Sequence, residues 1–166
     1  MSTDTAEPSW TAAAPHRAVR AWIQAVEHVF AGRESAVHKV ILDGRVEPLW
    51  FVIQSVDTIA SAARSHRPAV YWGHWRSDLH QRAIEAGLDD EWLRLRLAIV
   101  ALAEGRERSQ ELHVAELTEQ AVGEFGALDL AGAAVELAAV ALRLRYDVGL
   151  PAVFRRMREF FDIENA

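Results

Sequence analysis

Residues 127–142 read ALDLAGAAVELAAVAL and form the longest apolar run in the chain. Asp129 and Glu136 are its only charged residues. A helix that spans a bilayer needs about 20 apolar residues, so this run is too short to be one. We therefore expect a helix over Asp129–Asp147 that lies near the centre of a helical bundle.

Three charged residues of this predicted helix lie seven positions apart, at Asp129, Glu136 and Arg143. Seven residues make nearly two helical turns, so the three side chains share one narrow stripe. We interpret this stripe as the solvent or interface side of the helix. Glu136 is therefore a weak candidate for a buried catalytic carboxylate. Asp57 is equally weak, because it falls on the polar face of its own predicted helix.

Apolar residues at helical spacing predict further helices on both sides of this run. One begins at Pro15 and ends near Gly32. Asp89 or Asp90 caps another helix, which either ends at Gly105 or continues past it. The remaining predicted helices cover about 49–64, 69–86, 109–123 and 152–161.

Residues 37–53 allow two interpretations, because they contain the dipeptide Asp43-Gly44. Asp-Gly favours a hairpin turn where strands flank it, and residues 40–42 and 49–53 could be those strands. The other interpretation is a short helix that ends at Gly44, followed by a helix with Pro48 in its first turn. Apolar residues recur at helical spacing from position 49 to 63, which favours the helices.

The chain has 166 residues, a formal net charge of −6 and no cysteine. Disulfides, thiolate metal sites and cysteine nucleophiles are therefore excluded. An acidic surface repels the phosphate backbone, so we expect no nucleic-acid partner. Residues 1–14 lack the basic and apolar regions of a signal peptide, so we expect a cytoplasmic protein with no membrane partner. The predicted fold is an all-α single-domain bundle of six or seven helices over 15–166, after a flexible N-terminal tail over 1–14.

Aromatic and titratable side chains concentrate in residues 71–80, which read YWGHWRSDLH. On a helix, His74 and Asp78 are neighbours at i,i+4 and can form a hydrogen bond. A carboxylate on one imidazole nitrogen leaves the other nitrogen free for base chemistry. We predict His74 and Asp78 as the catalytic pair, or else an exposed pair of little energetic weight. The predicted ligand-binding residues are His66, Arg67, Tyr71, Trp72 and Trp75, with core packing as the alternative for the two tryptophans.

The sequence indicates no metal site and identifies no cofactor. The Glu-x-x-His and His-Glu-x-x-His motifs are absent, as are the glycine-rich phosphate loops and the Gly-x-Ser-x-Gly motif. Three histidines have an acid three or four positions away, about the number that chance predicts. They are His38 with Glu34, His74 with Asp78, and His113 with Glu116. A haem held by one histidine would leave no spacing signature.

We expect a small soluble protein that binds an organic small molecule between its helices. An enzyme that uses the His–Asp pair is the catalytic version of this hypothesis. The alternative is an interaction module, a homodimer or an accessory subunit, in which the small residues Gly132, Ala133 and Ala139 admit a partner helix. A second alternative is a haem or metal protein with a histidine ligand.

Overall fold

Seven helices make up the part of the chain that the computed structural model describes, namely residues 15–43, 46–146 and 155. No strand occurs in these residues, so the prediction of an all-α bundle is confirmed. The predicted tail over 1–14 and the predicted helix over about 152–161 lie outside the described residues, apart from Arg155. The helices are α2 (Pro15–Phe30), α3 (Ser35–Asp43), α4 (Pro48–Arg64), α5 (Pro68–Glu85), α6 (Asp90–Glu107), α7 (Glu111–Phe125) and α8 (Ala127–Tyr146).

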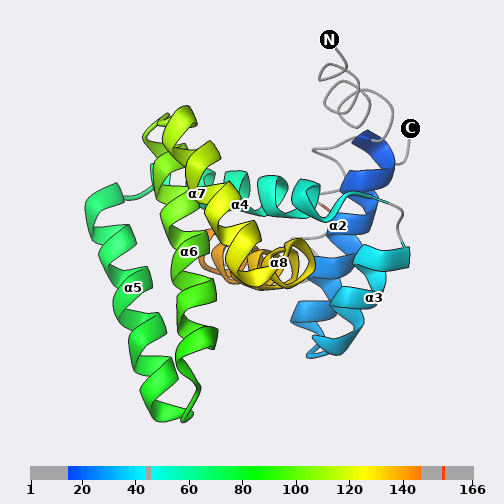
Figure 1. Ribbon diagram of the computed structural model, residues 1–166, viewed down its shortest axis with the longest axis horizontal. Helices are drawn as coiled ribbons and strands as arrows, with labels where there is room; N and C mark the ends of the chain where they lie inside the picture. The colour runs from blue at the N-terminus through cyan, green and yellow to red at the C-terminus, as the bar shows by residue number, and fades with distance from the viewer. Residues whose placement is uncertain (1–14, 44–45, 147–154, 156–166) are drawn as a thin grey trace.

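Helix α8 lies at the centre of the bundle, as its apolar sequence predicts (Figure 1). It packs against α2, α3, α4, α6 and α7. Figure 1 shows α2 and α3 on one side of α8, α5 and α6 on the other, and α4 crossing between the two groups. Helix α5 packs only against α6 and α4 within the described residues, so it forms the outer edge of the bundle.

The described residues within 37–53 form parts of two helices and no strand, which agrees with the second of the two interpretations. Helix α3 ends at Asp43, and Pro48 is the first residue of α4. Proline suits this position because its missing N–H would have no partner in the first turn. The apolar face of α4 is buried, with Phe51, Val52 and Ile59 in the core.

Local signals place the ends of several helices. The side chain of Asp89 accepts a hydrogen bond from the backbone N–H of Trp92 at 2.9 Å, so Asp89 is the N-cap of α6. Gly87 follows α5 with a φ of 62°, a left-handed conformation that glycine adopts without strain. Gly105 lies inside α6, where a Cβ would come within 2.8 Å of Val114 Cγ2. This glycine therefore permits close packing of α6 on α7 and does not end the helix.

No single helix in the described part of the chain has both the length and the apolar character to cross a membrane. Residues 111–125 and 127–144 meet that test only when they are counted together, across a bend of 114°.

Two buried tryptophans differ in whether their indole N–H group has a hydrogen-bond acceptor. The Nε1 of Trp22 on α2 donates to the hydroxyl of Ser55 on α4 at 3.0 Å, and both side chains are buried. The Nε1 of Trp75 on α5 is also buried but has no hydrogen-bond partner in the structure. A buried polar group without a partner costs about 1–3 kcal/mol.

The contrast predicts different stabilities for two otherwise similar substitutions. Trp22→Phe and Trp75→Phe remove the same atoms from buried sites, but only Trp22→Phe takes the donor away from Ser55. We expect Trp22→Phe to lower the free energy of unfolding by about 1–3 kcal/mol more than Trp75→Phe does. Urea denaturation of the two variants measures the difference. Equal losses would show that the Trp22–Ser55 hydrogen bond contributes nothing.

Candidate functional site

Four of the five predicted ligand-binding residues, His66, Tyr71, Trp72 and Trp75, form an aromatic cluster where α4 meets α5. The His66 ring stacks on Tyr71, with ring centroids 5.4 Å apart. The His66 Nδ1 lies 3.0 Å from the carbonyl oxygen of Ala62. Because a carbonyl only accepts, the Nδ1 of His66 is the donor in this hydrogen bond. Trp72 and Trp75 are core residues, as their helical stripe indicates.

The predicted catalytic pair lies on the outer face of α5. His74 and Asp78 are both exposed, and no hydrogen bond joins their side chains. Arg67, the N-cap residue of α5, is also exposed, and its side chain makes no capping hydrogen bond. The structure thus places these residues on one helix without building a closed pocket from them, and their catalytic or binding role stays a prediction.

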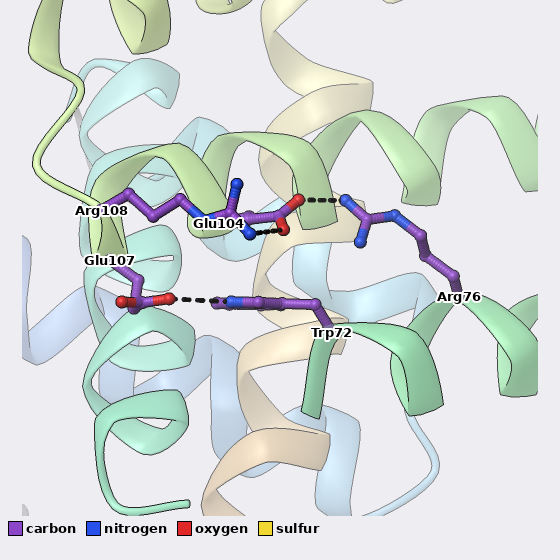
Figure 2. A network of polar contacts seen from close by, with 5 residues as sticks. All are labelled: Trp72, Arg76, Glu104, Glu107 and Arg108. Atoms are coloured by element: carbon purple, nitrogen blue, oxygen red, sulfur yellow. Dashed lines mark hydrogen bonds and ion pairs between the residues drawn. The ribbon is translucent and has the colours of Figure 1, made fainter. Parts of the chain in front are cut away.

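A polar network fixes the inner side of α5 to α6 (Figure 2). The Trp72 Nε1 donates to Glu107 Oε1 at 3.0 Å. The Glu104 carboxylate lies between two guanidinium groups: it pairs with Arg76, and its Oε2 is 2.9 Å from Arg108 Nη2. Both carboxylates belong to α6, whereas Trp72 and Arg76 belong to α5. This side of the 71–80 segment therefore attaches α5 to the bundle.

A second group of polar residues, not predicted as a site from the sequence, lines a half-open cleft of about 360 Å³ between α3, α6 and α8. We call it the α3–α8 cleft. Its walls also include Val29 at the end of α2. The polar lining residues are Glu34, Ser35, His38, Arg96, Asp129 and Glu136.

One wall of the cleft is held by an ion pair between α6 and α8. The Arg96 Nε donates to Glu136 Oε2 at 2.7 Å, and the Arg96 Nη2 donates to Glu136 Oε1 at 3.2 Å. The Nη1 of Arg96 donates to the carbonyl of Trp92 at 3.3 Å, and the guanidinium lies 4.3 Å from the Trp92 ring centroid. Each of the three guanidinium nitrogens of Arg96 thus donates a hydrogen bond within the protein, and one face lies against Trp92, so this side chain is part of the framework of the cleft.

The opposite wall brings His38 against the backbone of α8. A Cβ at Gly132 would lie 2.6 Å from His38 Nε2, closer than any real contact. The imidazole therefore occupies the space that a side chain at position 132 would fill. His38 is nevertheless exposed, because it lies on α3 at the mouth of the cleft.

The remaining carboxylates of the cleft belong to Glu34 and Asp129, and both are exposed. Glu34 immediately precedes α3, and Asp129 lies in the first turn of α8. The positive end of a helix dipole stabilises a carboxylate at such positions. Neither residue forms an ion pair with any described residue. Since three carboxylates and one guanidinium line the cleft, acidic groups are in excess there.

The sequence contained a signal for this cleft, but it pointed to a face of α8 and not to a site. Asp129 and Glu136 belong to the seven-residue stripe that we interpreted as a solvent or interface side. Gly132 and Ala133 continue this stripe at helical spacing, and all four residues line the cleft. His38 and Arg96 come from other helices, so their contribution depends on tertiary packing that periodicity does not specify.

A second cleft, of about 370 Å³, lies where α4 meets the α6–α7 turn. Two of its four charged side chains, Arg106 and Asp57, form an ion pair with each other. The Arg106 Nε lies 2.7 Å from Asp57 Oδ1, and the Arg64 Nη2 donates to the carbonyl of Arg106 at 3.3 Å. The lining has few apolar atoms, so it offers less to an organic molecule than the α3–α8 cleft does.

No group of three His, Asp or Glu side chains in the described residues is arranged to hold a metal ion. Comparisons with protein-family models, curated proteins and solved structures found no match to this chain.

The Arg96–Glu136 and Arg106–Asp57 ion pairs differ in solvent exposure, and this difference predicts how much each pair stabilises the fold. In the Arg96–Glu136 pair the side chains are 11% and 23% exposed, whereas in the Arg106–Asp57 pair they are 43% and 40% exposed. Glu136→Gln leaves a nearly buried guanidinium without its counter-charge, and we expect it to lower the free energy of unfolding by about 2 kcal/mol or more.

Asp57→Asn is the matched control, because it also converts an acid to an amide. Its partner is solvated, so we expect a loss below about 1 kcal/mol. Chemical denaturation of both variants measures the two losses. A loss for Asp57→Asn as large as that for Glu136→Gln would contradict the structural role assigned to Arg96.

Proposed function

We propose that the protein binds a small organic molecule that carries a cationic group, in the α3–α8 cleft. The observation that carries this proposal is the combination of apolar wall and carboxylates without ion pairs in one cavity. The apolar part consists of Val29, Val37, Leu95 and Ala133. Ligand sites typically combine such surfaces with a few polar groups that fix orientation.

The charge of the ligand follows from which groups are still available. An anionic ligand would need a free guanidinium or ammonium group in the cleft. Arg96 is the only basic side chain of fixed charge in the lining. Its charge is balanced by Glu136, and Glu136 and Trp92 accept hydrogen bonds from three of its five N–H groups. A cationic group, in contrast, would meet Glu34 and Asp129, which have no partner of opposite charge among the described residues. The electrostatic field of the cleft therefore favours an ammonium or guanidinium group.

The size of the cleft limits the ligand to a small molecule. A volume of about 360 Å³ is near the lower end of the range for ligand pockets, roughly 300–1,000 Å³. The apolar residues can accept a short aliphatic or aromatic body, while the carboxylates at the mouth retain contact with water. An extended polymer or a large cofactor would leave most of its surface outside.

Two features support this proposal over an interaction module. Ala133 and Ala139, which were expected to admit a partner helix, are buried within the chain itself. The large exposed apolar residues are spread over five helices and one turn, and scattered residues of this kind are normal on a protein surface. They are Leu42, Ile53, Val70, Ile84, Leu88, Leu112 and Leu144.

A pair of probes with the same aliphatic body and opposite charge tests the proposal. Isopentylammonium should bind and raise the Tm, whereas isocaproate should not, both measured at equal ionic strength. At a free concentration ten times its Kd, a bound probe stabilises the protein by about 1.4 kcal/mol, which raises the Tm of a domain this size by a few degrees.

Charge-neutral variants locate the binding. Asp129→Asn and Glu34→Gln should each weaken isopentylammonium binding severalfold, because each removes one carboxylate from the cleft. Glu119→Gln makes the same change on the exposed face of α7, outside the cleft, and should leave the affinity unchanged. Equal Tm shifts with the two probes, or an equal effect of Glu119→Gln, would contradict the proposal.

A further inference from the structure

We infer that Gly132 is a positioning residue for His38. Because position 132 has no side chain, the imidazole packs against the backbone of α8, and we call this Gly132–His38 contact the seat. The seat holds the His38 Nε2 at the wall of the α3–α8 cleft, where it is a hydrogen-bonding group for the ligand. This inference rests on the proposed function and adds a specific polar contact to it. A neutral imidazole nitrogen can accept a hydrogen bond from the N–H of a bound ammonium.

Three distances from a Cβ built at Gly132 to atoms of the His38 ring define the seat. A Cβ built at Gly132 would lie 2.6 Å from His38 Nε2, 2.9 Å from Cδ2 and 3.8 Å from Cε1. The edge of the ring formed by Nε2 and Cδ2 is therefore the part that approaches α8 most closely. Among the described glycines, only Gly105 is approached as closely, and there the neighbour is an apolar valine. Gly132 is thus the described glycine whose missing side chain makes room for a titratable group.

Glycine is otherwise an unfavourable choice at this position. Inside a helix it costs about 1 kcal/mol relative to alanine. The neighbours Ala131, Ala133 and Ala134 show that alanine suits this turn of α8. The contact with His38 gives a physical reason for the exception, because an alanine methyl at position 132 would displace the ring.

The contact is not needed to hold the core together. His38 is exposed, and the atoms that would clash are at the end of a rotatable side chain. A Cβ at position 132 can therefore push the ring into solvent without moving a helix. What the seat determines is the place of the imidazole relative to the cleft.

The surrounding charges fit this role. Glu34 and His38 lie four residues apart at the start of α3, so they are neighbours along one side of that helix. Asp129 is three residues before Gly132, one turn away along α8. Glu34, His38 and Asp129 all line one cavity, so a cation at the mouth of the cleft would meet both carboxylates and the His38 ring in the same site.

The decisive variant is Gly132→Ala. We expect it to fold with equal or higher stability, because alanine improves the helix, while the NMR signals of the His38 imidazole move toward those of a solvated histidine. We also expect about a fivefold loss of isopentylammonium affinity, which corresponds to one hydrogen bond. Gly123→Ala on α7 is the matched control: a Cβ there meets nothing within 4 Å, so it should gain helix stability and keep both the His38 signals and the affinity.

A double variant tests whether both residues act through the same contact. His38→Ala should lose about as much affinity as Gly132→Ala, and the combination should lose no more than His38→Ala alone. Unchanged His38 signals in Gly132→Ala would overturn the seat. Displaced signals with unchanged affinity would overturn the role of His38 in binding. If the wild-type protein does not bind isopentylammonium at all, the proposed function fails, and the His38 signals still decide whether the seat exists.

Discussion

The architecture of this molecule depends on how closely other helices can approach α8. Most of its buried positions carry alanine, and these side chains do not hold the neighbouring helices away. Helices normally pack 8–10 Å apart, and the shorter distances require small residues at the contact. Five helices pack against α8. Large buried side chains, such as Trp22 and Phe51, come from the helices around it and supply most of the hydrophobic gain.

The same helix determines where a ligand site can form. Charged side chains could not occupy the faces of α8 that α4 covers, because a buried charge without a partner is very costly. Asp129 and Glu136 are therefore restricted to the one stripe that stays accessible, where α3 and α6 diverge. The α3–α8 cleft is thus a consequence of the packing pattern and not an addition to it. Gly132 continues the small residues of α8 into the cleft. There the space beside it is filled by the His38 side chain, whereas elsewhere on α8 the small residues allow a neighbouring helix to approach.

Sequence periodicity predicted the helices far better than it predicted the candidate site. The all-α class, the central position of α8, a helix cap at Asp89 or Asp90, and helices on both sides of Asp43-Gly44 all follow from local patterns. The structure confirms the class and the position of α8, and it places the cap at Asp89. The cleft combines residues from α2, α3, α6 and α8, and their meeting depends on tertiary packing. The segment 71–80 was predicted as a site because it is rich in aromatic and titratable residues. Composition does not distinguish an indole that packs in the core from one that faces a ligand, and Trp72 packs in the core.

The charges of the cleft divide into two groups with different physical roles. Arg96 and Glu136 are largely desolvated and satisfy each other, so they make the wall rigid at little net gain in stability over apolar residues. Glu34 and Asp129 are solvated, and their attraction for a cation is weakened by water, with an effective dielectric constant nearer to 80 than to 20. Neither the carboxylates nor the small apolar wall would bind a ligand tightly alone. A ligand that satisfies both gains from each, whereas an anion with the same apolar body gains from the wall and is repelled by the mouth. We therefore expect the cleft to discriminate strongly between a cation and an anion with the same apolar body, even though it binds the cation with modest affinity.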